Sequence, residues 1–272
     1  MMKRHFMILL PVLAIACSSG EEPAETTDAN ATDTTEVVAL ERSDLLNRHL
    51  MGDVKTIEET PYMAAEDGAM GDMDSCCIEI IEFDNKGFLQ KITEKNSAGE
   101  VTAVTVQEYD ADGLFISRTR SVNGQEVWKR TVTRDDEGNG VMAYDTDADQ
   151  QMTDYYIVDE RNDFGQAVKG KSFSPDSTFV GTWSWKYIDG LRSGRGWADS
   201  NGKQLIDVTG EVNDKGWLAK STDTRVNEEG ESVTTVMTYT YDSFDDMGNW
   251  TQRTESENGV PVQILKRTYT YY

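Results

Sequence analysis

The chain has 272 residues, and its 49 acidic residues against 26 Lys and Arg give a formal net charge of −23 at pH 7. Charge attraction to nucleic acid or to an anionic bilayer is therefore excluded, and the length suits one or two domains. The two histidines are His5 and His49, so we expect neither a histidine-based nucleophile nor a zinc site within the fold.

Residues 1–16 have the layout of an export signal, with two basic residues followed by an apolar run over residues 6–16. The stretch 13–20 resembles the lipobox of bacterial lipoproteins and departs from it at Ala14, where that family usually has Leu. The resemblance implies cleavage before Cys17 and a diacylglycerol on its sulfur. We therefore expect a lipid anchor at Cys17 and a place in the bacterial cell envelope, with the outer membrane favoured. The alternative is an ordinary cleaved signal that precedes an accidental cysteine.

Residues 17–40 predict a disordered tether, because the stretch 18–40 has six acidic residues, no Lys or Arg, and little apolar surface to bury. Residues 41–52 favour one short helix or a linker. Leu45, Leu46 and Leu50 would lie on one helical face, and Gly52 would end the helix.

From residue 53 onward, glycines recur at intervals of about 26 residues, which indicates a repeat. The series is Gly87, Gly113, Gly138, Gly165, Gly190, Gly216 and Gly248. In copies such as Asp84-Asn85-Lys86-Gly87, the Asp opens a type I turn and the Gly takes the left-handed position that follows. Each copy therefore predicts a hairpin with a bulge.

A second series of turns lies between the first. It includes Asn-Gly at 123–124 and 258–259, which favours a two-residue type I′ hairpin, whereas the copies near Ala148 and Pro175 lack the glycine. Thr, Val, Tyr and Trp are frequent between turns. The predicted fold class over residues 53–272 is all-β: a long antiparallel meander of repeated hairpins, about 26 residues per unit and about fifteen strands, in a single curled or elongated sheet. Its first strand would run over residues 53–62 and pair with a strand over residues 76–83.

The pattern Tyr-Asp-x-x-Gly-aromatic, followed by Arg-Thr, Asn-Gly and Tyr-Thr-Tyr, is clearest over residues 239–272. This pattern resembles that of the YD-repeat (Rhs-like) family, and the chain is similar to short cell-envelope lipoproteins built from such repeats. The resemblance covers residues 53–272 and is weaker in the middle. It implies a long, curling antiparallel sheet without an activity of its own, since function in large members of the family lies in appended domains. We expect no appended toxin or enzyme here.

One acidic stretch imitates a metal site. Asp145, Asp147 and Asp149 have the spacing of the first half of a calcium loop, but Gln150 and Tyr156 stand where an EF-hand has Gly and Glu. Because the stretch also falls at a repeat turn, a solvated acidic turn is the alternative.

The adjacent residues Cys76 and Cys77 would point to opposite faces of a strand. Two free thiols are therefore favoured over a vicinal disulfide.

Aromatic side chains mark one strand as a candidate ligand site. Trp183, Trp185 and Tyr187 share one face of the segment 179–187 and would suit stacking on a sugar, while packing within the sheet is the alternative. An outer-membrane barrel would fit the strand number and length, but the segment 127–134 places basic side chains on both faces, so neither face suits lipid.

These observations predict a non-enzymatic, lipid-anchored envelope protein without a cofactor, which presents a β-repeat surface to a protein or a glycan. A carboxylate-using carbohydrate-active enzyme is the first alternative, although 49 acidic residues make any single pair of carboxylates uninformative. A purely structural spacer is the second.

Overall fold

The computed structural model describes residues 44, 48–74, 76–136, 138–163 and 166–272. The export signal, Cys17, the acidic tether and most of residues 41–47 lie outside the described residues, so the predictions for them stay predictions. Within the described part, no helix combines the length and the apolar character that crossing a membrane requires.

The described fold is all-β, as the repeat predicts, and seventeen strands form one sheet. The strands are β1 (Val54–Ala64), β2 (Met70–Met73), β3 (Ile78–Phe83), β4 (Leu89–Lys95), β5 (Val101–Tyr109), β6 (Phe115–Val122), β7 (Gln125–Arg134), β8 (Gly140–Asp147), β9 (Met152–Arg161), β10 (Ala167–Phe173), β11 (Phe179–Ile188), β12 (Leu191–Asp199), β13 (Gln204–Val212), β14 (Leu218–Val226), β15 (Ser232–Phe244), β16 (Trp250–Glu257) and β17 (Val260–Tyr271).

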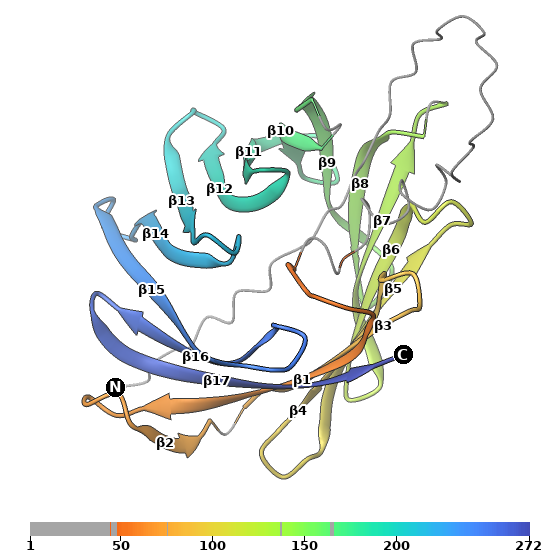
Figure 1. Ribbon diagram of the computed structural model, residues 1–272. Helices are drawn as coiled ribbons and strands as arrows, with labels where there is room; N and C mark the ends of the chain where they lie inside the picture. Colours follow the sequence, from red (N-terminus) through yellow and green to blue (C-terminus); the bar gives the residue numbers. More distant parts are fainter. Residues whose placement is uncertain (1–43, 45–47, 75, 137, 164–165) are drawn as a thin grey trace, which may run out of the picture.

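The sheet closes on itself. Each strand from β3 to β17 pairs antiparallel with the next, and β1 pairs with β3 on one side and with β17 on the other. The predicted curled sheet is therefore a barrel of 16 strands, to which the short strand β2 is added along β1. Figure 1 shows the strands circling an enclosed space.

The repeat explains the curvature. A β-bulge lies just before the glycine turn in several copies, at 82/83 between β3 and β4, at 108/109 between β5 and β6, and at 211/212 between β13 and β14. Bulges bend a strand and increase its twist. Because the same irregularity recurs along the sheet, the bends add up and allow the two ends of the sheet to meet.

Most of the described turns have the predicted geometry. Gly165 lies outside the described residues, and at Gly190 the chain instead makes a two-residue hairpin, in which Asp189 and Gly190 have φ values of 49° and 77°. Gly87, Gly113 and Gly216 have φ values of 84°, 75° and 77°. The Asp84 carboxylate accepts hydrogen bonds from two backbone N–H groups inside its turn, which stabilises the turn locally. In the two copies that lack glycine, Gln150 and Ser177 take the left-handed conformation instead, with φ values of 58° and 67°.

Residues 48–52 pack against one end of the barrel, which we call the plugged end. Leu50 belongs to a buried cluster with Val54, Ile57, Ile81, Phe83 and Leu89. The Met51 N–H donates to Asn249 Oδ1 at 2.7 Å, and Asn249 Nδ2 donates to the Met51 carbonyl at 2.9 Å. Trp217 Nε1 donates to the His49 carbonyl at 3.3 Å. The turns of the Asp-x-x-Gly series surround this end, and the turns of the second series surround the opposite end.

Candidate ligand site inside the barrel

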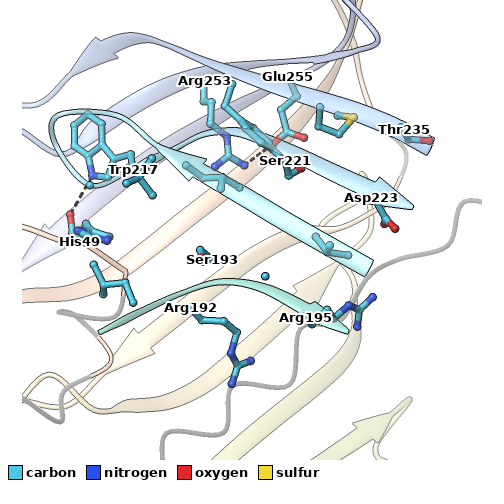
Figure 2. A pocket seen from close by; sticks show the side chains of 18 of the residues that line it. His49, Arg192, Ser193, Arg195, Trp217, Ser221, Asp223, Thr235, Arg253 and Glu255 are labelled. Atoms are coloured by element: carbon cyan, nitrogen blue, oxygen red, sulfur yellow. Dashed lines mark hydrogen bonds and ion pairs between the residues drawn. The ribbon is translucent and has the colours of Figure 1, made fainter. Parts of the chain in front are cut away.

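A cavity of about 900 Å³ lies inside the barrel, against β12 to β17 and residues 48–49. This volume is typical of sites that hold small molecules. Arg192 and Arg195 of β12 line the cavity on one side, and Arg253 and Glu255 of β16 line it on the other (Figure 2).

The lining of this cavity is cationic. Among the described residues that line it, six are arginines and only two are acidic, although the whole chain carries a net charge of −23. The arginines are Arg48, Arg192, Arg195, Arg225, Arg253 and Arg267, and the acids are Asp223 and Glu255. Valine, leucine and aromatic side chains supply most of the remaining lining. An arrangement of this kind attracts an anion that also has a substantial apolar or ring surface.

Three of these arginines are held by carboxylates of the inner face. Arg225 Nη2 lies 2.6 Å from Asp223, Arg253 pairs with Glu255, and Arg267 Nε lies 2.7 Å from a Glu59 oxygen. Arg253 keeps one buried donor, Nε, without a hydrogen-bond partner among the described residues. Hydrogen bonding in these pairs fixes the guanidinium groups in place before any ligand arrives.

A smaller cavity of about 250 Å³ adjoins the first, and Arg195 lines both. Trp183, Trp185 and Trp197 line the smaller cavity. The structure therefore places Trp183 and Trp185 side by side, with their ring centroids 6.4 Å apart. Both rings face the barrel interior and not an open outer surface. Tyr187 donates to the Ala167 carbonyl at 3.0 Å and lines neither cavity.

The predicted calcium residues do not converge. Asp145 is buried and binds both Nε and Nη2 of Arg130 at 2.6 Å, whereas Asp147 accepts backbone N–H groups of its own turn and Asp149 is exposed. Among the described residues, no group of three or more His, Cys, Asp or Glu is placed to hold a metal ion. The repeat turn accounts for the positions of Asp147 and Asp149, whereas Asp145 lies within β8.

Three glutamates lie side by side on the inner face. Glu59 on β1 pairs in register with Glu79 on β3, which pairs in register with Glu94 on β4. Arg267 binds Glu59, and Arg120 binds Glu94 through both of its terminal nitrogens. Burial, together with the neighbouring carboxylates, raises the pKa of Glu79 to about 7. These glutamates do not line either cavity.

Cys76 and Cys77 form a vicinal disulfide in the structure, so the expectation of two free thiols is wrong. Cys77 has a φ of 81°, outside the regular strand conformation that the sequence argument assumed. The pair precedes β3, where the chain is exposed or half-buried.

Sequence reasoning missed the inner arginines. It used basic side chains on both faces of one strand only to argue against contact with lipid, although Arg118, Arg120 and Arg130 all share the inward parity. The spacing of two residues between Arg118 and Arg120, with Arg130 in register opposite Arg118, was the signal that could have revealed an inner cationic face.

No known family model matches the sequence, and no curated protein matches it. Among solved structures, a porin-like protein from Bacteroides uniformis is similar, with a TM-score of 0.51 and 11% identity over 81% of this chain and 98% of that chain. A TcdB2-TccC3-Cdc42 complex gives a TM-score of 0.30 at 14% identity, with 75% of this chain and 13% of that chain covered. A DUF1329 family protein from Desulfovibrio piger gives 0.26 at 9% identity, with 86% and 90% covered. The first likeness concerns the barrel fold alone, and the other two superimpose too poorly to support an argument.

Proposed function

We propose that this chain is a non-enzymatic, lipid-anchored protein of the bacterial envelope that holds an anionic glycan inside its barrel. The observation that carries the proposal is the cavity of about 900 Å³ in which six arginines face two acids, within a chain of charge −23. Such a reversal of charge inside an acidic protein steers anions to the interior and repels them from the outside.

The position of the cavity favours a glycan over a folded protein as the partner. The arginines and tryptophans face the space enclosed by the sheet, where a folded domain would not fit but a few linked sugar rings would. Sugar rings combine apolar C–H faces with polar edges, and the lining supplies aromatic rings beside charged donors.

The outer face supports an aqueous position next to a membrane. Exposed ion pairs lie on it, such as Lys91 with Glu82 and Lys220 with Glu211. Charges of this kind cost several kcal/mol each in the middle of a bilayer, so we infer that the barrel stays in water and that the lipid on Cys17 holds it to the membrane. The resemblance to YD-repeat lipoproteins agrees with this arrangement.

Glycan binding is tested with the purified full-length protein in detergent, on an array of acidic and neutral oligosaccharides. We expect binding to acidic glycans, and weaker binding as salt is raised, because part of the attraction is electrostatic. Equal binding to neutral and acidic glycans, or binding to none, would count against the proposal.

The anchor is tested by mass spectrometry of the protein extracted from membranes. We expect a mature chain that begins at a diacylated Cys17, and release or stalled processing of Cys17→Ala. An intact Met1 in the membrane form, or an unmodified Cys17, would contradict the anchor.

A second candidate function, a carboxylate-using carbohydrate-active enzyme, rests on the row formed by Glu59, Glu79 and Glu94. A carboxyl group with a pKa of about 7 beside a second carboxylate is the pairing that glycoside hydrolysis uses. The test is release of reducing ends from polysaccharides by the wild-type protein, with Glu79→Gln as the control that would abolish it. We favour binding, because this row lies away from the lining of both cavities.

A further inference from the structure

Arg195 lies where the two inner cavities meet. It stands on β12 between Trp185 of β11 and Val208 of β13, and it lines both the cavity of about 900 Å³ and that of about 250 Å³. Any ligand that extends from the wide space toward the tryptophans passes this side chain.

The charge of Arg195 is left without a carboxylate. Among the described residues no hydrogen bond or ion pair joins its guanidinium to an acidic side chain. Asp223, the acid whose charge acts on Arg195, accepts three hydrogen bonds from Arg225. Burial, and then the like charge of Arg225, lower the pKa of Arg195. A partly desolvated cation in this position is stabilised by an incoming anion.

Tryptophan rings beside Arg195 are held in fixed positions. The ring of Trp183 lies over Gly170, and that of Trp197 lies over Gly181, where a Cβ atom would come within 3.0 Å of the ring. Trp183 Nε1 already donates to the Lys171 carbonyl at 3.2 Å, so this side chain offers its ring and not its N–H to a ligand. Fixed rings lose little conformational entropy when a sugar packs against them.

Together these features define a site for a carboxylated sugar. We propose that Arg195 binds the carboxylate of a uronic acid unit while Trp183 and Trp197 contact the ring of that sugar. The planar guanidinium matches a carboxylate with two parallel hydrogen bonds, and the rings take the C–H face of the sugar. The inference rests on the proposed function, since it names the unit of the glycan that the barrel would recognise.

Calorimetric titration of the full-length protein in detergent tests the inference. The probe is a tetrasaccharide of galacturonic acid, and the neutral control is maltotetraose. We expect the wild-type protein to bind the galacturonate at least about tenfold more tightly than maltotetraose. Arg195→Gln is expected to lose at least about tenfold in affinity, and Arg195→Lys to show an intermediate loss because it keeps the charge without the planar pair of donors.

Lys186→Gln is the matched control. Lys186 lies on the neighbouring strand β11, faces outward and pairs with Asp207, so its substitution removes one positive charge from the opposite face. We expect it to bind galacturonate as the wild type does. Circular dichroism and melting temperature check that each variant is folded. If Arg195→Gln does not fold, the affinity of Arg195→Lys for galacturonate tests the role of Arg195.

The outcomes separate the inference from the proposed function. Binding of galacturonate by Arg195→Gln as tightly as by the wild type overturns the role of Arg195. If affinity for galacturonate is lost only in Arg225→Gln, the carboxylate is bound from β14 instead, and the proposed function stands. Failure of the wild type to bind galacturonate overturns the inference. Failure to bind every acidic glycan on the array removes the proposed function as well.

Discussion

The inner and outer faces of the barrel use different cations in their ion pairs. On the inner face the cation is arginine, in the pairs Arg120–Glu94, Arg130–Asp145, Arg225–Asp223, Arg253–Glu255 and Arg267–Glu59. On the outer face the cation is lysine, in the pairs Lys91–Glu82, Lys171–Asp159, Lys186–Asp207 and Lys220–Glu211. The two faces alternate residue by residue along the same strands.

The difference follows from how the two cations are hydrated. A guanidinium is weakly hydrated and forms several directed hydrogen bonds, so it tolerates partial burial, whereas an ammonium is strongly hydrated and stays in water. The outer pairs therefore contribute to solubility and little to stability. The inner pairs build a rigid surface of donors, which is what a binding site for an anion needs.

The largest effect is expected from breaking an inner pair. Arg130→Met leaves Asp145, which is 5% exposed, without its cation, and we expect a loss of about 3–5 kcal/mol in the free energy of unfolding. Urea denaturation measures it. Lys220→Met, which breaks an exposed outer pair, is the control and should cost less than about 1 kcal/mol. Equal losses in the two variants would contradict the distinction between the faces.

The next effect is a pH dependence that comes from the inner face. The pKa of Glu79 rises from 4.5 to about 7 on folding, through burial and through Glu59 and Glu94. A carboxyl with a raised folded pKa favours the folded state below pH 4.5, and this contribution is lost as pH rises toward 7, by up to about 3 kcal/mol.

We therefore expect Glu79→Gln to remove most of the fall in stability between pH 4.5 and 7. Urea denaturation at several pH values measures this slope. Glu82→Gln changes an acid on the outer face of the same strand and is the matched control. An unchanged slope in Glu79→Gln would show that the glutamate row does not titrate in this range.

A smaller effect distinguishes the two ends of the barrel. Gly113 at the plugged end and Gly124 at the opposite end both have positive φ, 75° and 78°. A Cβ at Gly113 would lie 2.7 Å from the ring of Phe88, whereas a Cβ at Gly124 would meet nothing within 4 Å. We expect Gly113→Val to cost about 2 kcal/mol and Gly124→Val about 1 kcal/mol, because only the first adds a clash to the backbone strain. Thermal unfolding of both variants tests this order, which the reverse ranking would refute.

The smallest effect concerns coupling within an outer pair. A double-mutant cycle on Lys91 and Glu82 should give a coupling below about 1 kcal/mol that shrinks in high salt. The same cycle on Arg120 and Glu94 of the inner face should give a larger coupling that salt changes less. A salt-sensitive inner pair would indicate that the interior is as solvated as the outside.

Local features of the fold could be predicted well because a few residues decide each of them. The left-handed glycines at 87, 113 and 216 and the pairing of β1 with β3 are confirmed. The vicinal disulfide at Cys76 and Cys77 was not expected, since the argument assumed a regular strand that the positive φ of Cys77 interrupts. The short strand β2 was also missed, because four exposed residues have no alternating pattern to read.

The candidate site was predicted in part. Trp183 and Trp185 were singled out because aromatic alternation is visible in the sequence, and the structure brings them together. Arg195 was not, because its role depends on Trp185 and Val208 of neighbouring strands and on which face of the sheet becomes the inside.

The sequence by itself determined most of the turns and the alternation of the two faces, since these depend on backbone preferences and hydrogen bonds that span a few residues. Only the tertiary structure decided that the sheet closes and that one face becomes an interior. Closure joins Thr56 to Thr270, whose hydroxyl oxygens lie 2.6 Å apart across 214 positions in the chain. Closure depends on the twist and the bulges accumulated over sixteen strands, so a pattern of a few residues cannot predict it.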